Sequence, residues 1–509
     1  MNDKNKLAPC IAVLGTGSEV GKSVVATALC RIFANQGIRV APYKAQNMSN
    51  NSGVTPEGLE MGRAQIVQAQ AARIAPHVDM NPILLKPTSD VGSQVVLLGR
   101  AGENSSAVEY HHQKDRLFSE ACAALDRLRN RYDLVVIEGA GSCAEVNLMP
   151  HDIVNFKIAE YADAPVLLVA DIHRGGVFAQ IVGTLACLAP HQQDLIVGTI
   201  INRFRGDIRL FTDGIEWLED RTGKTVFGVH PWYSHFVIES EDSVVIENPA
   251  RVSPENIVDP AVAVLRLPHI SNFTDFDPLS GLTDLNLYFL EKHQPLDRFK
   301  AVILPGSKNT RFDLKWLMDS GWSDEISRYS RQGGHVLGIC GGFQMMGRVV
   351  HDPHGLEGAP GSTPGLSLLP VETTLEAPKT TTLTRFVWGE SEGWGYEIHM
   401  GRTVRDAGQP LLRVIEQNGA VCTKEDGCVS ADARSMGTYV HGFFDTPAIA
   451  DRWLRSIGLD HIEVSTLQGH DARDRDFEQL AAHFEQHVDV GQISASCRIP
   501  ADESKRNDR

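Results

Sequence analysis

Short apolar runs alternate with amphipathic segments along the first half of the chain. In segments such as 24–35 and 62–75, apolar residues recur at helical spacing. The apolar runs that we predict to be strands are residues 10–14, 40–43, 134–138, 166–170, 195–201 and 226–229. Alternation of this kind predicts an α/β fold with a doubly wound, mostly parallel sheet and helices on both of its faces.

A polar stretch at residues 239–260 interrupts this pattern and contains an Asn-Pro and a Ser-Pro step, which are typical of a linker. A second α/β pattern follows, from Val262 to about Asp445. The last residues of the chain have the low hydrophobicity of disordered segments. We therefore predict a first domain at 1–238, a linker at 239–260, a second domain at 261–455, and a helical tail with a disordered end at 456–509.

Length and composition exclude several classes of protein. The chain has 509 residues, 42% of them apolar and 22% charged, as in soluble globular proteins of about two to four domains. No signal-like or membrane-spanning apolar run is present. Nine scattered cysteines form no Cys-x-x-Cys pair, which argues against zinc or a disulfide scaffold and favours the reduced cytoplasm. A net charge of −16 argues against nucleic acid as a partner.

One cysteine has surroundings typical of a nucleophile. The apolar run that starts at His335 ends in Gly338-Ile-Cys340-Gly-Gly342. Glycines at this spacing predict a sharp strand-to-helix turn with the cysteine at its apex. A thiol at a helix N-terminus has a lowered pKa and attacks as a thiolate. The alternative is an inert cysteine buried at the end of a core strand.

Two further segments complete a candidate site. His441 ends a short β-rich run and is a candidate base for Cys340, and the loop 304–308 follows an apolar strand and is a candidate oxyanion-binding loop. Together the pieces resemble the class I glutamine amidotransferase domain. The resemblance implies that the Cys340 thiolate attacks the glutamine amide, forms a glutamyl thioester and releases ammonia. It also implies His441 as the catalytic partner and Gly306 and Gly341 as the oxyanion hole.

The match departs from class I at one position. The family has a Glu two residues after the histidine, where this chain has Phe443. The resemblance is therefore to the triad-variant branch that serves cobyrinic and cobyric acid amidation, in which the third member is missing or supplied elsewhere. Glu397 is one candidate for orienting His441, and the sequence leaves the choice open.

A Gly-rich turn follows the first predicted strand, from Gly15 to Ser23, and precedes a helical segment. In such a turn backbone N–H groups point at phosphate, the lysine reaches the β- and γ-phosphates and the serine binds Mg²⁺. A threonine replaces one glycine of the strict P-loop, and this variant resembles the loop of dethiobiotin synthetase. A chance Gly-rich turn is the alternative. The residues that the resemblance assigns to ATP are Thr16, Gly17, Ser18, Glu19, Val20, Gly21, Lys22 and Ser23.

Other predicted strand ends extend this site. Glu138 ends the strand 134–138 and is placed to hold Mg²⁺ together with Ser23, although an acid there is also common as ordinary surface. Asn202 resembles the residue that holds the adenine base in the same relatives. Open α/β sheets bind ligands at the carboxyl ends of their strands, where these residues lie.

An ATP site and a glutaminase on one chain imply a glutamine-dependent ligase. ATP would phosphorylate a carboxylate, and ammonia shielded from bulk water would displace the phosphate. The following stretches resemble the cobyric acid synthase family: 44–52, 79–90, 169–178, 267–277, 304–310 and 395–401. The resemblance implies amidation of the b, d, e and g carboxylates of adenosylcobyrinic acid a,c-diamide, with one glutamine and one ATP for each, to give adenosylcobyric acid in cobalamin biosynthesis.

A polycarboxylate substrate needs cationic contacts. Lys44, Arg63, Lys86 and Arg174 lie in or near the resembling stretches and are candidates, although most such side chains are simply solvated. Asp152 is a candidate for aligning the carboxylate or metal, or else a helix N-cap. The sequence leaves a homo-oligomer open.

Two alternatives remain at this point. The a,c-diamide synthase joins the same two domain types but acts on other carboxylates, and the stretch that begins at Lys44 favours cobyric acid synthase. A ParA-like nucleotide switch with an inactive amidotransferase domain is a rival from another class. That rival predicts the loss of Cys340 or His441, and both are present.

Overall fold

Six parallel strands form the central sheet of the first domain, in the order β12-β11-β10-β1-β9-β2. The computed structural model describes residues 7–89, 92–233, 257–464 and 470–499. The sheet strands are β1 (Cys10–Gly15), β2 (Val40–Tyr43), β9 (Leu134–Glu138), β10 (Val166–Asp171), β11 (Ile196–Phe204) and β12 (Thr225–Pro231). The predicted doubly wound parallel sheet is therefore confirmed.

Helices cover both faces of this sheet because its strands are apolar on both sides. Ile11 and Val13 of β1 pack in one hydrophobic core, and Ala12 and Leu14 pack in the other. The helices of this domain are α1 (Lys22–Asn35), α2 (Arg63–Ala71), α3 (Ala107–Arg131), α4 (Phe156–Ala162), α5 (Val177–Cys187), α6 (Pro190–Leu195) and α7 (Thr212–Thr222). The α1 side chains lie in the first core, and those of α3, α4 and α5 lie in the second.

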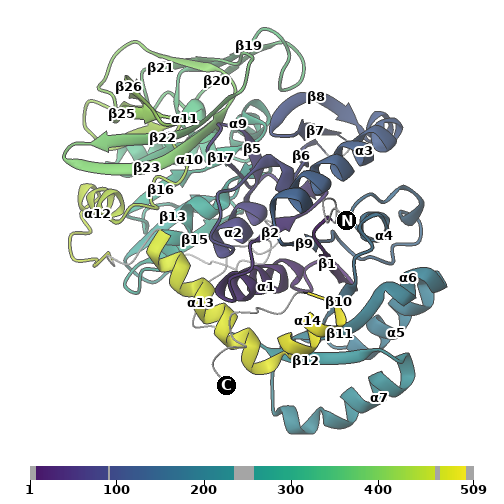
Figure 1. Cartoon of the computed structure of the whole chain (residues 1–509). Helices are drawn as coiled ribbons and strands as arrows, with labels where there is room; N and C mark the ends of the chain where they lie inside the picture. Colours follow the sequence, from purple (N-terminus) through teal and green to yellow (C-terminus); the bar gives the residue numbers. More distant parts are fainter. Residues whose placement is uncertain (1–6, 90–91, 234–256, 465–469, 500–509) are drawn as a thin grey trace.

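A small subdomain is inserted between β2 and β9, and the periodicity of the sequence did not predict it. It contains the sheet β3-β6-β7-β8 and the hairpin of β4 and β5. Its strands are β3 (Gln46–Met48), β4 (Ser52–Val54), β5 (Glu60–Gly62), β6 (Ile83–Ser89), β7 (Gly92–Leu97) and β8 (Arg100–Ser106). In Figure 1 this subdomain lies between the first sheet and the second domain.

The second domain has its own sheet, in the order β15-β13-β16-β18-β28-β27, which is parallel except for β27. Its strands are β13 (Ala261–Leu265), β15 (Asn286–Leu290), β16 (Ala301–Leu304), β18 (His335–Ile339), β27 (Cys428–Val429) and β28 (Ser435–Thr438). Its helices are α8 (Asp277–Ser280), α9 (Thr310–Asp319), α10 (Trp322–Arg331), α11 (Gly341–Met346) and α12 (Pro447–Ser456). The second α/β domain that the sequence predicted is present.

Two four-stranded sheets extend the second domain, in the orders β20-β19-β21-β24 and β23-β22-β25-β26 (Figure 1). Their strands are β19 (Val349–Asp352), β20 (Gly361–Pro364), β21 (Val371–Thr374), β22 (Thr380–Trp388), β23 (Ser391–His399), β24 (Arg402–Arg405), β25 (Leu412–Gln417) and β26 (Ala420–Asp426). A two-stranded ladder of β14 (Ile270–Ser271) and β17 (Gly306–Ser307) lies beside the main sheet. The long β22–β23 hairpin places β23 in contact with β4 of the first domain.

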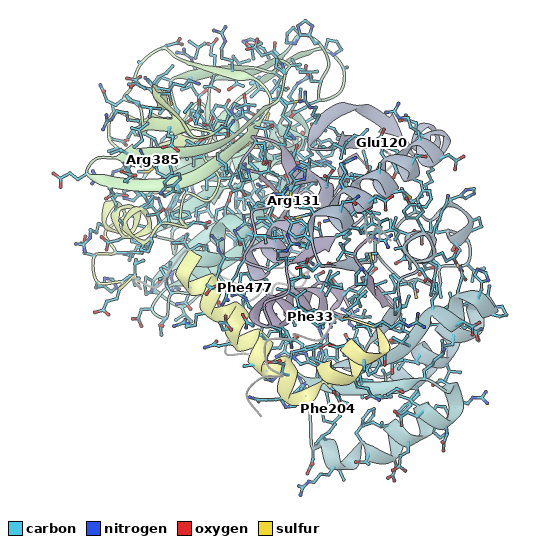
Figure 2. All side chains as sticks on the ribbon, in the orientation of Figure 1. Phe33, Glu120, Arg131, Phe204, Arg385 and Phe477 are labelled. Atoms are coloured by element: carbon cyan, nitrogen blue, oxygen red, sulfur yellow. The ribbon has the colours of Figure 1, made fainter. Side chains whose placement is uncertain are left out.

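The C-terminal helices return to the first domain. Helices α13 (His470–His487) and α14 (Val490–Ser496) share a hydrophobic core with α1, and Figure 2 shows Phe477 of α13 near Phe33 of α1. Arg31 of α1 is fully buried, and its guanidinium lies 2.5 Å from Asp474 and 3.2 Å from Glu478 of α13. Most of the predicted linker and the predicted disordered end, from residue 500, lie outside the described residues.

All nine cysteines are free thiols, and they fall within the described ranges. Among the helices of those ranges, none combines the length and the apolar character that crossing a bilayer requires.

The Arg31 ion pairs should hold α13 on the first domain. Replacing Arg31 by Met removes two charge-assisted hydrogen bonds, so we expect the free energy of unfolding to fall by about 2–4 kcal/mol. Amide exchange across residues 470–487 should accelerate in the same variant. The matched control is Arg39→Met, because Arg39 pairs with Asp133 at 2.6 Å but is 68% exposed, and this change should cost less than about 1 kcal/mol. Equal effects of the two variants would contradict the assignment.

Candidate active sites

Cys340 occupies the turn between β18 and α11. Its backbone has φ 52° and ψ −109°, a conformation that non-glycine residues rarely adopt and that is found at strained functional turns. The turn is held by a hydrogen bond from the Cys340 N–H to the Thr438 carbonyl oxygen at 2.8 Å. The sharp strand-to-helix turn that the glycine spacing predicted is therefore present.

The flanking glycines are required by close packing. A Cβ atom at Gly342 would lie 1.9 Å from the Leu304 carbonyl oxygen, and one at Gly338 would lie 2.7 Å from the Phe343 nitrogen. No side chain fits at such distances. The glycines thus let the turn press against β16, which fixes the position of the thiol.

His441 lies between the Cys340 thiol and a buried carboxylate. Its Nδ1 atom is 2.6 Å from Oδ2 of Asp275, and both side chains are 2% exposed. The other oxygen of Asp275 accepts a hydrogen bond from the Gly442 N–H at 2.9 Å. The imidazole also hydrogen-bonds with the Cys340 side chain. The three residues therefore have the arrangement of a nucleophile, a base and an orienting acid.

The electrostatics of this group favour a protonated imidazole. Burial by itself lowers the pKa of His441, but the negative charges of Asp275 and Cys340 and the hydrogen bonds to both outweigh it and raise this pKa to about 10. An imidazolium next to a cysteine is the arrangement in which cysteines act as thiolate nucleophiles.

Asp275, and not Glu397, orients the histidine. Glu397 instead accepts hydrogen bonds from the Thr384 hydroxyl at 2.9 Å and from the Gln417 amide at 3.0 Å. Phe443, where class I enzymes have the Glu, is fully buried against Phe386. Asp275 belongs to the stretch 267–277 that resembled the family, but no local pattern linked it to a histidine 166 positions away.

The two predicted oxyanion-hole glycines lie at this site. A Cβ atom at Gly306 would come within 2.9 Å of the His441 ring, and one at Gly341 would come within 2.8 Å of the Ser307 nitrogen. The loop after β16 and the first turn of α11 therefore approach each other beside Cys340. Whether their N–H groups hold an oxyanion stays a prediction.

The Gly-rich turn connects β1 to α1. The Lys22 ammonium donates hydrogen bonds to the carbonyl oxygens of Gly17 at 2.9 Å and Gly141 at 2.8 Å. This bridges the turn to the loop that follows β9. Gly21 has φ 99°, a conformation that favours glycine. The Thr16 hydroxyl donates to Gln180 at 3.3 Å.

Ser23 and Glu138 form an oxygen-rich pair beside this turn. The Ser23 hydroxyl donates to Oε1 of Glu138 at 2.8 Å, and the carboxylate is fully buried. Lys44 lies 3.0 Å from the same oxygen, and Gln68 donates to the other. Mg²⁺ in phosphate-transfer sites takes one or two protein oxygens together with phosphate oxygens and water. The donor set present here fits that ion.

Asn202 contacts the phosphate turn from the end of β11. Its amide donates to the Val20 carbonyl oxygen at 2.9 Å, and its oxygen lies 3.0 Å from Nδ1 of His230. His483 of α13 lies 2.9 Å from the other His230 nitrogen. Burial, together with the neighbouring His483 and His487, lowers the pKa of His230 to about 3, so its ring is neutral.

The basic candidates for substrate binding differ in their surroundings. Lys44 contacts Glu138, as described above. Arg63 is the first residue of α2 and is 8% exposed. Arg174 is 74% exposed and lies 3.3 Å from Glu19 of the phosphate turn. Asp152 accepts hydrogen bonds from the N–H groups of Val154 at 2.9 Å and Asn155 at 3.1 Å. These contacts stabilise the turn before α4, whose N-cap is Asn155, so Asp152 is not the N-cap of that helix.

Lys86 belongs to a buried ion cluster between the two domains. Its ammonium is 2.8 Å from Glu60, and Lys379, which immediately precedes β22 in the second domain, is 2.6 Å from the other Glu60 oxygen. Burial lowers the pKa of Lys379 to about 7 despite the attraction of Glu60. The cluster joins the inserted subdomain to the second domain.

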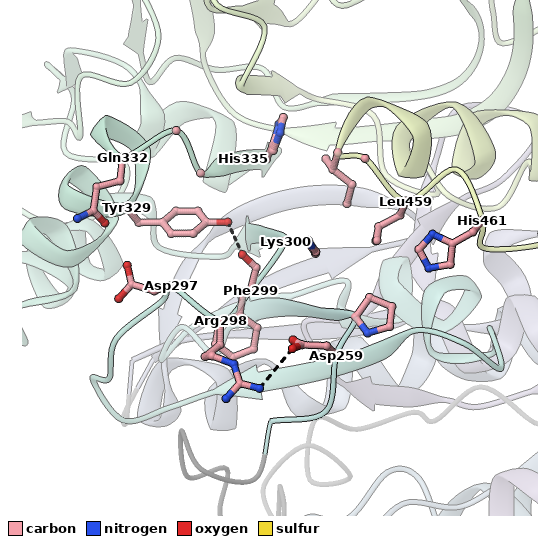
Figure 3. A pocket seen from close by; sticks show the side chains of 15 residues that line it. Asp259, Asp297, Arg298, Phe299, Lys300, Tyr329, Gln332, His335, Leu459 and His461 are labelled. Carbon is pink, nitrogen blue, oxygen red and sulfur yellow. Dashed lines mark hydrogen bonds and ion pairs between the residues drawn. The ribbon is translucent and has the colours of Figure 1, made fainter.

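A cavity of about 790 Å³ lies at the opposite end of the second sheet, lined by Asp259, Arg298, Lys300 and His335 among others (Figure 3). His335 is the first residue of β18, whereas Cys340 follows its last residue. Parallel α/β sheets carry their reactive groups at the carboxyl ends of the strands. This cavity is therefore not the candidate active site.

Comparison with protein families matches both domains. Residues 11–244 match the CobQ/CobB/MinD/ParA nucleotide binding domain, and residues 261–449 match the CobB/CobQ-like glutamine amidotransferase domain. The two matched ranges contain the phosphate turn and the Cys340–His441 pair, respectively.

Several curated relatives match nearly the whole chain. The cobyric acid synthase of Chlorobaculum tepidum is 52% identical over 95% of this chain and 97% of its own length. The cobyric acid synthase of Chlorobium chlorochromatii is 51% identical over 95% of this chain and 96% of its own length. The cobyric acid synthase of Syntrophobacter fumaroxidans is 45% identical over 94% of this chain and 97% of its own length.

Asp275→Asn should slow the alkylation of Cys340 by iodoacetamide at pH 7. Without the carboxylate charge, burial of His441 prevails and its pKa falls, so the cysteine loses its cationic neighbour. Charges at hydrogen-bond distance shift a pKa by about 1–3 units, so we expect alkylation to slow by about tenfold or more. Glu397→Gln is the matched control and should leave the rate unchanged. Slowing in the control, but not in Asp275→Asn, would show that Glu397 orients the histidine.

Proposed function

The chain belongs to the cobyric acid synthase family, and we propose that it amidates the b, d, e and g carboxylates of adenosylcobyrinic acid a,c-diamide. It is a glutamine-dependent amidating ligase of cobalamin biosynthesis. Each amide would consume one glutamine and one ATP, and the product would be adenosylcobyric acid. The single observation that carries the proposal is the presence on one chain of a Cys340–His441–Asp275 group and a phosphate-binding turn.

In the glutaminase step the Cys340 sulfur attacks the amide carbon of glutamine. The oxyanion that forms would be held by the N–H groups of Gly306 and Gly341. His441 gives its proton to the leaving nitrogen, so the C–N bond breaks and ammonia departs, leaving a glutamyl thioester. Water activated by the then neutral imidazole hydrolyses the thioester to glutamate. Asp275 keeps Nδ1 protonated and aims the ring at the sulfur.

In the synthetase step the substrate carboxylate attacks the γ-phosphorus of ATP, the bond from this phosphorus to the β,γ-bridging oxygen breaks, and ADP leaves as an acyl phosphate forms. Lys22 and the backbone of the phosphate turn would bind the transferred group, and Asn202 would bind the adenine base. Ser23 and Glu138 would hold Mg²⁺, which neutralises charge on the phosphates when bound. Ammonia then attacks the acyl phosphate carbon, and inorganic phosphate leaves as the amide forms.

The four basic candidates divide into two groups under this proposal. Lys44 lies 3.0 Å from Glu138 and would act near the position where the reacting carboxylate receives phosphate. Arg174 is exposed beside the phosphate turn and can reach a carboxylate that arrives from solution. Arg63 and Lys86 are buried near the second domain and would act on the substrate only indirectly. We place the reaction in the cytoplasm, where free thiols stay reduced.

Mass spectrometry tests the substrate and the origin of the nitrogen. With Mg-ATP and glutamine, adenosylcobyrinic acid a,c-diamide should gain four amides in succession. Cys340→Ala should gain none from glutamine, because the thioester cannot form, yet it should form all four when ammonium salt is added. If the diamide stays unchanged while cobyrinic acid gains two amides, the enzyme is instead an a,c-diamide synthase.

Lys22→Met should disable the ATP-dependent synthetase step. Its ammonium is needed at the phosphoryl group whatever the nitrogen source, so amidation should fall by about 10²- to 10³-fold with glutamine and with ammonium salt alike. Initial rates of phosphate release in the presence of the diamide give the measurement. Ammonium-dependent amidation near the wild-type rate would contradict the assigned role of the turn.

A further inference from the structure

The turn that carries Asp275 lies in the interface between the two domains. Asn272 precedes the short helix Phe273–Phe276, and its side chain is 2% exposed. Its amide nitrogen donates to the Ser52 carbonyl oxygen at 2.9 Å, and its oxygen accepts from the Ser52 N–H at 3.4 Å. Asn272 therefore pairs with β4 of the first domain much as a neighbouring strand would.

A second bond ties the same turn to the first domain. The Thr274 hydroxyl donates to the Asn51 side-chain oxygen at 3.1 Å, and both residues are buried. Thr274 is the residue immediately before Asp275. The carboxylate that orients His441 is thus fixed through contacts with residues 51 and 52 of the other domain.

Asn272 also reaches His441 by a separate route. Its amide donates to the Tyr396 hydroxyl at 2.9 Å. The Tyr396 ring stacks on the His441 ring, with centroids 5.4 Å apart and planes 22° apart. The two residues also exchange backbone hydrogen bonds at 2.8 and 3.0 Å. The imidazole is therefore held at its edge by Asp275 and at its face by Tyr396.

On the side of the first domain, these contacts continue toward the phosphate site. Asn51 and Ser52 end the stretch that begins with Lys44, and Lys44 lies 3.0 Å from Glu138. The Ser52 hydroxyl accepts from Lys86 at 2.8 Å and donates to Glu60 at 2.9 Å. One stretch of nine residues, 44–52, thus connects the carboxylate beside the phosphate turn to the Asp275 turn.

We propose that Asn272 and Thr274 are positioning residues through which the first domain sets the His441–Asp275 geometry. Glutamine is then hydrolysed at full rate only when the stretch 44–52 holds the turn in place, so ammonia release depends on the state of the synthetase site. This inference rests on the proposed function. Asn272 has φ 52°, and such a backbone persists where surrounding contacts over-determine it.

The test compares two variants of the turn. Asn272→Gly removes the side chain and keeps the positive φ without steric cost, and Thr274→Val removes only the hydroxyl hydrogen bond. We expect kcat for glutamine hydrolysis to fall by about 10- to 100-fold in Asn272→Gly and by less in Thr274→Val. KM for glutamine should change by less than about threefold, because the proposal has both residues act on the His441–Asp275 geometry and not on glutamine binding. Amidation with ammonium salt should stay at the wild-type rate.

A double-mutant cycle separates positioning from simple structural support. If Asn272 acts through Asp275, adding Asn272→Gly to Asp275→Asn should lower kcat much less than it does in the wild type. Lys379→Met is the matched interface control, since Lys379 bridges the domains through Glu60 without touching the turn. It should leave the kcat of glutamine hydrolysis within about twofold.

Every other outcome of these experiments would overturn either this inference or the proposed function. An equal loss of kcat in Lys379→Met, full additivity in the cycle, or a parallel loss of ammonium-dependent amidation in both turn variants would overturn the inference. A wild-type enzyme that hydrolyses glutamine but does not amidate the diamide with ammonium would refute the proposed function instead. The comparison of glutaminase rates would still test the role of the turn.

Discussion

The buried contact between Asp275 and His441 is the constraint on which the second active site depends. A carboxylate and an imidazole 2.6 Å apart, both removed from water, attract each other far more strongly than the same groups at a surface. That attraction keeps the ring protonated and aimed at Cys340, whose strained turn fixes the thiol from the other side. Because Asp275 sits on an interface turn, the first domain takes part in building the glutaminase.

The same organisation explains why the two chemistries occupy one chain. Each parallel sheet presents its reactive residues at the carboxyl ends of its strands, the phosphate turn after β1 and Cys340 after β18. The inserted hairpin of β4 and β5 and the long strand β23 meet between them. The buried Glu60, with a lysine from each domain, adds an ionic contact to this interface. A buried ion pair of this kind favours one docking geometry more than it adds stability.

Features of the site that depend on local sequence could be predicted, and those that depend on tertiary contacts could not. Apolar periodicity located the six strands of the first sheet, and glycine spacing located the Cys340 turn and the phosphate turn. The partner of His441 could not be found in this way, because it lies in a separate turn and Phe443 fills the usual position with core packing. The docking of α13 on α1 also escaped prediction, since the buried Arg31 resembles a surface residue in sequence. The roles assigned to individual substrate residues stay predictions.

The most direct test of the coupling between the two active sites traces the amide nitrogen of glutamine into the product. The enzyme would be incubated with adenosylcobyrinic acid a,c-diamide, Mg-ATP and glutamine labelled with nitrogen-15 in the amide, in an excess of unlabelled ammonium. The account predicts a product with four new amides, nearly all of them labelled, because ammonia released at Cys340 passes to the acyl phosphate without mixing with solvent. Four mostly unlabelled amides would contradict the shielded coupling of the two sites, and an unchanged diamide would contradict the function itself.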